Sequence, residues 1–482
     1  MTLPVELLQR RRALERYDAV IVGAGVPGLV CACMLAGAGL RVVVVDRRKR
    51  PGGHLQTLSH QGYALDVGPV LWESPVFEQI LEAVGVKDHG LTEVPAGGMQ
   101  VAIVGERGIE SGPRVPPVAG TVPSPSILDA VKELLGVPPR VFAALGGLYE
   151  ELAGATGEQL EEWRRTELDA WLAERSVEPA VKQALHRSAA LLGAEEPARA
   201  SVAAIAARAR ADRSRSGWSL AGDNPIAGAR GVVQALVDRL IDAGGELRLG
   251  TRATGLAIDA RRFAGLTVQK EEQPFAEEIL ADRCILALTT SSLAAVVPDE
   301  PLRALAATTP PDTALLGSAW AIDGEATFAD AERAWVVRGL PPAGADPATL
   351  PLSSPVTFVR ASAAAPRLAP PGKGLVLAWT AIPSRVARDA RLVSSRLGHL
   401  RAALEGLLGG ADASGIEWHR SWTLPWSRRD AFAPVSGTGS MPGFEQIYVV
   451  NEEVDVPGRS AGGVVAAATA ARTIAERVLA GA

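Results

Sequence analysis

The sequence predicts an α/β protein in which one domain is built from separated segments and a second domain is inserted between them. Two observations lead to this fold class. A continuous apolar run at residues 19–22 precedes a glycine-rich turn and an apolar helix, and a second strand, made of Arg41 and four valines, follows at 41–45. A similar strand and helix, at 447–450 and 462–479, come near the end of the chain. Short continuous apolar runs are typical of parallel strands that are buried on both faces.

The first unit carries a glycine motif that suits a dinucleotide. Gly23, Gly25 and Gly28 lie between the strand and the helix, and Val26 and Pro27 start that helix. The first glycine permits a tight turn, the second lets the backbone approach a pyrophosphate, and the third allows close packing of helix and strand. The helix N-terminus offers free N–H groups to the phosphates.

Acidic and basic residues follow at the end of the second strand. Asp46 comes eighteen residues after Gly28, where a carboxylate can accept hydrogen bonds from a ribose diol. Arg47 is next in the chain and is included in the predicted binding site. The unit therefore predicts a Rossmann-like domain, and its motif alone does not separate NAD from FAD.

Two short sequences beyond this unit separate the two cofactors. The sequence RPGGHLQT contains Gly53 and His54, and the sequence DVGP contains Gly68 and Pro69. They resemble the phytoene desaturase and flavin-containing amine oxidase superfamily, and DVGP is more similar to the carotenoid desaturase branch. In that family the glycine pair crosses the FAD pyrophosphate and the second segment runs close to the isoalloxazine. The resemblance therefore implies FAD.

Later segments extend the resemblance. A stretch that ends shortly before Ala253 is similar to the family segment whose backbone meets the adenine, which implies that role for Ala253. The C-terminal residues Glu452, Gly462, Gly463 and Val464 resemble the second FAD motif. In the family an acidic residue there binds the ribityl chain, and N–H groups of the last helix face flavin O2.

The sequence departs from the family pattern at three positions. His54 stands where arginine is usual, and Asn451 stands where glycine is usual. Glu453 adds a second acid beside Glu452. These departures bear on the chemistry more than on the fold.

The order of patterns along the chain predicts the domain organisation. An FAD-binding domain is expected from residues 17–90, 223–300 and 441–482. Residues 91–222 and 301–440 mix helical spacing with strand-like runs, and they are expected to form an α+β substrate domain. Within the inserted part, the charged stretch at 208–215 is expected to be a solvated helix face.

Three tryptophans are candidates for substrate contact. Trp72 follows DVGP, and Trp422 and Trp426 precede the last strand, where family members often line the substrate cavity. Core packing is the alternative for each of them. No cluster of Arg or Lys in that stretch of sequence indicates an anionic substrate, so we expect an apolar small molecule.

The resemblance implies an FAD-dependent oxidoreductase that is similar to phytoene dehydrogenases. Such an enzyme transfers a hydride between flavin N5 and a largely apolar substrate. The alternatives are a flavin amine oxidase, a flavin-assisted isomerase and a non-catalytic escort protein of the same fold. The intact glycine motif argues against loss of the cofactor, and the glycine pair argues against an NAD(P)-dependent dehydrogenase. Substrate, electron acceptor and oligomeric state stay open.

Composition excludes some partners. The 482 residues are 47% hydrophobic, which suffices for two or three domains with large cores. The net charge of −5 gives no electrostatic reason to expect nucleic acid. The three cysteines and six histidines show no metal-binding spacing, so no metal is expected.

The same composition bears on location. Few cysteines weakly favour a cytoplasmic setting. Residues 1–16 contain three consecutive arginines and leucines at helical spacing. They predict either a helix that packs on its own domain or peripheral contact with an anionic membrane surface.

Overall fold

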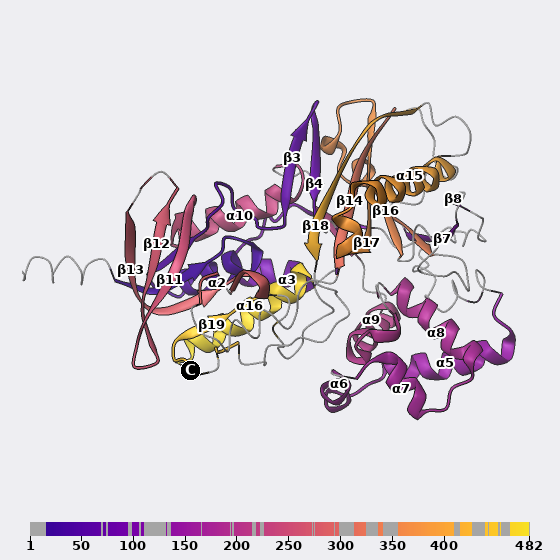
Figure 1. The fold of residues 1–482 in the computed structure, drawn as a ribbon, viewed down its shortest axis with the longest axis horizontal. Helices are drawn as coiled ribbons and strands as arrows, with labels where there is room; N and C mark the ends of the chain where they lie inside the picture. The colour runs from indigo at the N-terminus through magenta and orange to yellow at the C-terminus, as the bar shows by residue number, and fades with distance from the viewer. Residues whose placement is uncertain are drawn as a thin grey trace, which may run out of the picture.

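The fold is seen in a computed structural model of the chain (Figure 1). It describes residues 16–68, 71–73, 76–94, 99–105, 108–109, 132, 136–164, 166–192, 194, 197–214, 218–221, 226–271, 273, 275–293, 295–297, 313–323, 336–340, 355–408, 415–426, 439–441, 443–451, 454 and 463–481. Most of the amphipathic segment predicted at 1–16 lies outside these ranges, so both interpretations of it stand. None of the helices in the described ranges is long and apolar enough to cross a membrane.

A parallel sheet joins three separated parts of the chain. Its strands run in the order β10 (Glu246–Arg248), β2 (Val42–Val45), β1 (Tyr17–Val22), β13 (Ala276–Leu286) and β19 (Ile447–Val449), and every neighbouring pair is parallel. All residues of β2 and β19 are buried, as the apolar runs predict. The predicted Rossmann-like α/β fold from discontinuous segments is confirmed.

Strand β13 belongs to two sheets. Its C-terminal half pairs with β1, whereas residues 276–280 pair antiparallel with β12 (Arg262–Lys270). Strand β12 then pairs with β11 (Thr251–Asp259), and the register of that pair shifts between Ala253 and Gly255. Only residues 249 and 250 separate β10 from β11, so the start of β11 lies beside the end of β10.

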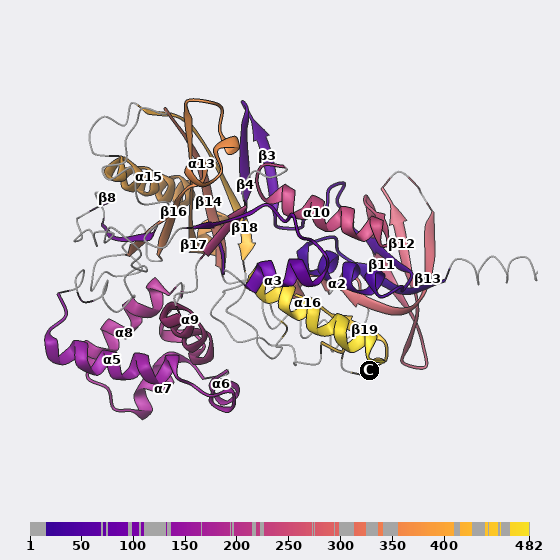
Figure 2. The same ribbon diagram turned by 180° about the vertical axis from the view of Figure 1, so that it is seen from behind.

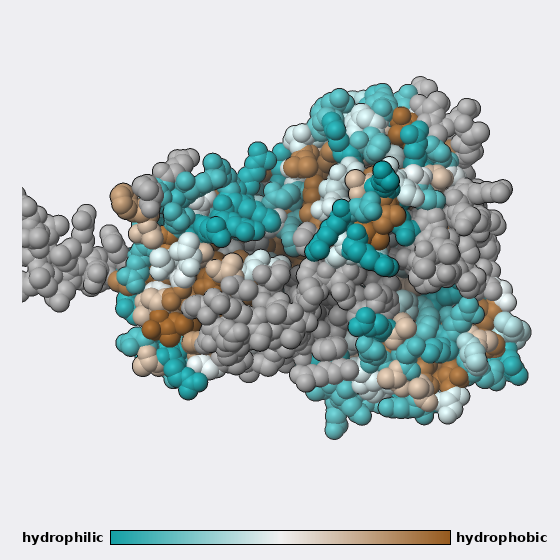
Figure 3. All heavy atoms as spheres, in the orientation of Figure 1, coloured by the Kyte–Doolittle hydropathy of each residue, from teal (hydrophilic) through white to brown (hydrophobic). Residues whose placement is uncertain are grey.

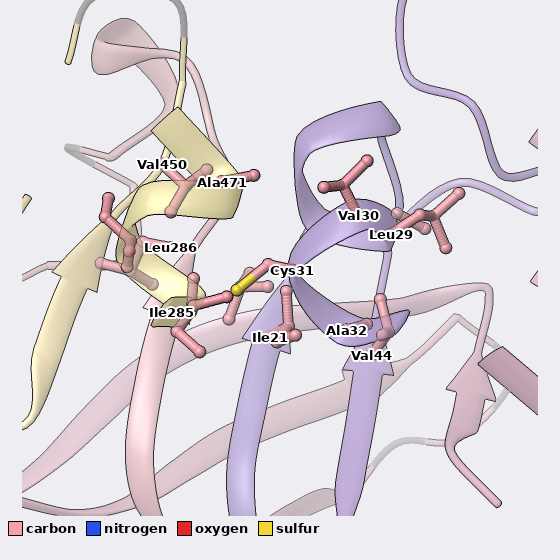
Figure 4. Close-up of a cluster of buried hydrophobic side chains, with 14 of the residues drawn as sticks. Ile21, Leu29, Val30, Cys31, Ala32, Val44, Ile285, Leu286, Val450 and Ala471 are labelled. Carbon is pink, nitrogen blue, oxygen red and sulfur yellow. The ribbon is translucent and has the colours of Figure 1, made fainter. Parts of the chain in front are cut away.

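Helix α2 (Val26–Gly37) packs on the parallel sheet, and helix α16 (Val464–Leu479) lies beside it (Figure 4). It is apolar and buried along nearly its whole length, because the sheet covers one side and α16 another. Cys31 of α2 points toward the side chains around Ile285 of β13. Burial raises the pKa of the Cys31 thiol to about 12, in keeping with a packing role. Helices α10 (Ala229–Asp242) and α3 (Val76–Ala83) add to the same core.

A second, seven-stranded sheet forms the core of the inserted part. Its strands run in the order β18 (Ile416–Trp426), β14 (Thr313–Asp323), β17 (Lys373–Pro383), β16 (Val356–Arg360), β15 (Val336–Leu340), β7 (Met99–Gly105) and β8 (Gly108–Ile109). Helix α15 (Ala390–Leu407) packs on one face through Leu400 and Leu404. The hairpin of β3 (Gln56–His60) and β4 (Tyr63–Val67) packs on the other face.

A cluster of helices lies beside this sheet, as both Figure 1 and Figure 2 show. It consists of α5 (Pro139–Ala153), α6 (Gly157–Trp163), α7 (Leu168–Glu174), α8 (Pro179–Leu191), η1 (Pro197–Arg199) and α9 (Val202–Ser214). A small sheet of β5 (Leu71–Glu73), β9 (Trp218–Ala221) and β6 (Leu91–Val94) connects to it. Short helical turns complete the chain at α11 (Thr290–Leu293), α13 (Ala361–Ala364), η2 (Pro366–Leu368) and α14 (Ser384–Ala387).

The prediction of a solvated charged face at 208–215 is wrong at its start. Arg208 is buried within α9. Arg210 donates a hydrogen bond to the carbonyl oxygen of Ala153 at 3.3 Å. The reason is that α9 packs along α5, which covers one face of the helix whatever its composition.

Candidate cofactor site

A cavity of about 340 Å³ lies at the carboxyl ends of the parallel strands. The turns after β1, β2, β13 and β19 all contribute to it, together with the start of β11 and the first turn of α16. In open α/β sheets this edge is where ligands bind, because the loops that follow neighbouring strands meet there. The cavity is therefore where the predicted cofactor residues should be sought.

Most of the predicted cofactor residues line this one cavity. They come from all three separated segments and are Gly23, Gly25, Val26, Pro27, Asp46, Arg47, Gly53, His54, Ala253, Gly463 and Val464. The fold thus brings together residues that are more than 400 positions apart in the sequence. Their individual roles stay predictions.

Two predicted glycines lie behind the cavity wall. A Cβ atom on Gly28 would come within 2.0 Å of the carbonyl oxygen of Gly23. A Cβ atom on Gly68 would come within 2.5 Å of the carbonyl oxygen of His54, and Gly68 has φ +111°. Both positions therefore require glycine for backbone packing. Pro69, Glu452 and Gly462 lie outside the described residues.

Asp46 connects the two turns that frame the cavity. Its Oδ2 accepts a hydrogen bond from the N–H of Ala24 at 2.8 Å, and its Oδ1 accepts one from the N–H of Arg48 at 2.8 Å. The carboxylate thereby holds the glycine turn against the end of β2. Carboxylate oxygens have further lone pairs, so Asp46 can still accept hydrogen bonds from a ribose diol in the cavity.

Two helix N-termini meet at this cavity. Helix α2 begins after Gly25 and α16 begins after Gly463, and neither has a side-chain N-cap. The first N–H groups of a helix lack partners inside the helix and carry a partial positive charge. Two such ends at one cavity suit an anionic ligand such as a pyrophosphate, and also negative charge on a reduced ring system.

The glycine pair closes one side of the cavity. Gly52 donates a hydrogen bond to the carbonyl oxygen of Ala24 at 2.7 Å, and a Cβ atom on Gly53 would lie 3.1 Å from the Cα of Gly25. The guanidinium of Arg48 donates to the carbonyl oxygen of Gly53 at 2.5 Å. Gly53 has φ +60°, so glycine at this position lets the two turns approach closely without strain.

Sequence reasoning missed several residues of the cavity wall. Arg48 and Arg252 line it, so positive charge is present although His54 replaces the usual arginine. The signal for Arg48 was available, because it lies only two residues after the strand-end acid Asp46. Asn451 also lines the cavity, and its side chain donates to the carbonyl oxygen of Leu288 at 2.8 Å.

A buried carboxylate that does not line the cavity connects two elements of the surrounding structure. Asp66 on β4 accepts hydrogen bonds from the hydroxyl of Thr57 at 2.5 Å and from the N–H of Ala229 at 3.0 Å, where α10 begins. Burial raises the pKa of Asp66 to about 6, although both donors favour its ionised form. Asp66 therefore ties the β3–β4 hairpin to α10.

The candidate substrate tryptophans lie elsewhere. Trp72 is 2% exposed and packs against Phe77, with ring centroids 5.4 Å apart, in the core beneath the cofactor cavity. Trp422 lies half-buried on β18 and lines a different cavity. The side chain of Trp426 is outside the described part of the structure. The placement of Trp72 favours its alternative role in core packing.

The parallel sheet and the cavity at its edge together define an α/β protein with a Rossmann-like domain. The model of the flavin containing amine oxidoreductase family matches residues 26–475, and the chain belongs to this family. The match spans almost the whole chain and includes strands β2, β10, β13 and β19 of the parallel sheet, whereas β1 precedes it.

Curated relatives match over a shorter stretch. Hydroxyneurosporene desaturase of Cereibacter sphaeroides is 45% identical over 78 residues, which are 16% of this chain and 16% of that protein. The matched stretch thus spans about one sixth of the length of the first curated relatives.

Solved structures show the same fold over nearly the whole chain. An oxidoreductase from Methanosarcina mazei has a TM-score of 0.68 at 17% identity and covers 95% of this chain and 99% of its own. A RAB GDI from Plasmodium falciparum has a TM-score of 0.56 at 12% identity, with 97% and 98% covered. At such identities the likeness concerns the fold alone.

Proposed function

We propose that this protein is an FAD-dependent oxidoreductase. One observation carries the proposal: two uncapped helix N-termini, a glycine turn and the carboxylate of Asp46 line a single cavity at the sheet edge. Asp46 suits an adenosine ribose, and the start of α2 suits a pyrophosphate. These are the two groups that distinguish a flavin dinucleotide from a mononucleotide.

In this proposal some residues of the chain bind groups of the cofactor, and others position it. Asp46 accepts hydrogen bonds from the ribose, Arg47 and Arg48 neutralise phosphate charge, and Ala253 lies at the adenine. At the other end, the N–H groups after Gly463 face the flavin ring and favour negative charge on it. The bound flavin would supply two-electron redox chemistry, and the protein's own residues would orient it and exclude water.

The proposed substrate is a largely apolar molecule that is dehydrogenated or saturated at a carbon–carbon bond. The hydroxyneurosporene desaturase named above supports this class over amines. We further propose that the parallel-sheet part holds the cofactor and that the seven-stranded sheet and the helical cluster hold the substrate. Amine oxidation and a non-catalytic escort role are the competing functions.

The test begins with the cofactor. The purified protein should be yellow, and acid precipitation should release a flavin that chromatographs as FAD and not as FMN. A colourless protein that also fails to take up added FAD would refute the proposal and favour an escort role.

The substrate class is tested on the same preparation without oxygen. The more saturated precursor of an acyclic polyene should reduce the flavin and bleach its absorbance. The polyene itself should reoxidise the reduced flavin. Bleaching by primary amines, with none by apolar hydrocarbons, would replace the proposed activity with amine oxidation.

A further inference from the structure

A second cavity, of about 780 Å³, lies on the other side of the glycine-pair segment. It is partly open to solvent and is bordered by the β3–β4 hairpin, the first turns of α10 and the middle of β18. These three elements lie side by side in both Figure 1 and Figure 2. Leu55 lines this cavity and the cofactor cavity alike, so a single buried side chain contributes to both walls.

The lining of this second cavity carries positive charge. The exposed arginines Arg50, Arg230 and Arg420 line it together with His60, and none of the described residues that line it is acidic. A nitrogen of Arg420 lies 3.3 Å from Nε2 of His60. The nearby carboxylate of Asp66 is buried and already accepts hydrogen bonds from Thr57 and Ala229.

The rest of the cavity lining mixes apolar side chains with the uncharged polar residues Gln56, Thr57, Ser59, Gln234 and Ser421. The apolar side chains include Leu58, Leu65, Val233 and Trp422. Leu58 is 47% exposed, so its side chain is accessible from the cavity. Figure 3 shows hydrophobic surface where the hairpin meets β18, next to the hydrophilic surface over α10.

We propose that this cavity binds an amphiphilic anion, an apolar chain that ends in a phosphate or a carboxylate. Guanidinium groups bind both headgroups through paired hydrogen bonds. The carboxylate of Asp66 attracts Arg230, so Arg50 and Arg420 carry most of the positive charge that is left for a ligand. The leucines and Trp422 would bury the chain. The sequence stretch around Trp422 contains no cluster of basic residues, but the fold brings Arg420 to one cavity with Arg50 and Arg230 from distant segments.

The site stands apart from the proposed redox function. It uses side chains of the hairpin, α10 and β18, and only Leu55 is shared with the cofactor cavity. A protein that binds the anion without holding a flavin would refute the proposed function and leave this inference intact. A flavoprotein that does not bind the anion would refute this inference and leave the proposed function intact.

Calorimetric titration of the flavin-loaded protein with dispersed octyl phosphate, below its micelle-forming concentration, tests the inference. Octyl phosphate should bind, whereas octanol and inorganic phosphate should each bind at least about tenfold more weakly, since each lacks one half of the recognised chemistry. Octanoate should bind in the same cavity and compete with octyl phosphate.

Variants locate the binding. Arg420→Ala and Arg50→Ala should each weaken octyl phosphate binding by about tenfold or more, and Arg420→Lys by less, because it keeps the charge and loses the planar fork. Arg388→Ala is the matched control, since this exposed arginine after α14 does not line the cavity. Flavin content and melting temperature show that each variant is folded.

Three results would overturn the inference. One is unchanged binding in both the Arg420→Ala and Arg50→Ala variants. Another is octanol binding as tightly as octyl phosphate. The third is binding to vesicles that contain phosphatidylglycerol when dispersed octyl phosphate does not bind, which would indicate a membrane-contacting surface instead of a cavity for one discrete molecule.

Discussion

The cofactor cavity and the second cavity lie on opposite sides of one segment but are built differently. The first is shaped by backbone: glycine turns, strand ends and helix N-termini. The second is shaped by side chains that project from a hairpin, a helix and a strand. Backbone geometry follows from short contiguous motifs, whereas a set of side chains from distant elements exists only in the folded protein. Four predictions test how far this contrast extends.

The largest effect is expected at Trp72, and it tests whether this side chain packs in the core or contacts a ligand in a cavity. Trp72→Ala should lower the free energy of unfolding by about 3–5 kcal/mol, because a fully buried indole leaves a void in the core. Trp422→Ala should cost clearly less, since that ring is half-exposed. Chemical denaturation of both variants measures the difference. A stable Trp72→Ala protein with an altered flavin spectrum would instead place Trp72 at the cofactor.

Asp66, which connects the β3–β4 hairpin to α10, should make the free energy of unfolding depend on pH. Its native pKa of about 6 lies above its usual value, so the native state binds the proton more tightly than the unfolded state. The stabilisation is present below the usual pKa and is lost as the pH rises through about 6. Relative to Asp66→Asn, the wild type should lose on the order of 2–3 kcal/mol between pH 4 and 7.

Urea titrations of both proteins across that range measure the effect of Asp66. Asp389→Asn serves as the control, because Asp389 is an exposed N-cap that accepts from Arg391 and Leu392. Parallel stability curves for the wild type and Asp66→Asn would show that the buried carboxylate has an ordinary pKa.

Asp46 tests whether the first cavity binds a ribose. Asp46→Ala should weaken FAD binding by about ten- to a hundredfold, equivalent to about 1.5–3 kcal/mol, because hydrogen bonds to an ionised group are lost. Titration of the flavin-free protein measures the affinity. Arg388→Ala should leave it unchanged. An unaltered affinity in Asp46→Ala would mean that the cavity holds another ligand or another orientation of the flavin.

The smallest effect is expected from one added methyl group. Gly28→Ala should destabilise the protein by about 1–3 kcal/mol and reduce flavin retention, because the new Cβ meets the carbonyl oxygen of Gly23 at 2.0 Å. Gly146→Ala in α5 is the matched control, since nothing lies within 4 Å of its Cβ. It should be neutral or stabilise by about 0.5–1 kcal/mol. Equal melting temperatures for the two variants would contradict this account of the glycine motif.

Much of the parallel sheet was predictable from sequence. Strands β1, β2 and β19 were found as apolar runs, and helices α2 and α16 as apolar helices. The seven-stranded sheet was not predictable, because its long strands pair with partners far away in the chain. The sequence of each strand does not show which partner it takes. The burial of Arg208 was missed for the same reason, since burial depends on the neighbouring helix α5.

The sequence by itself determined the glycine turns, the acid at the end of β2 and the fold class, because these features depend on local backbone geometry and on short apolar runs. Only the tertiary structure decided which side chains meet. It joined Asp46 to the turn at Ala24, placed Trp72 in the core, and brought Arg50, Arg230 and Arg420 to one cavity. The physical reason is that contacts between distant segments follow from how whole elements pack, and no local pattern encodes that packing.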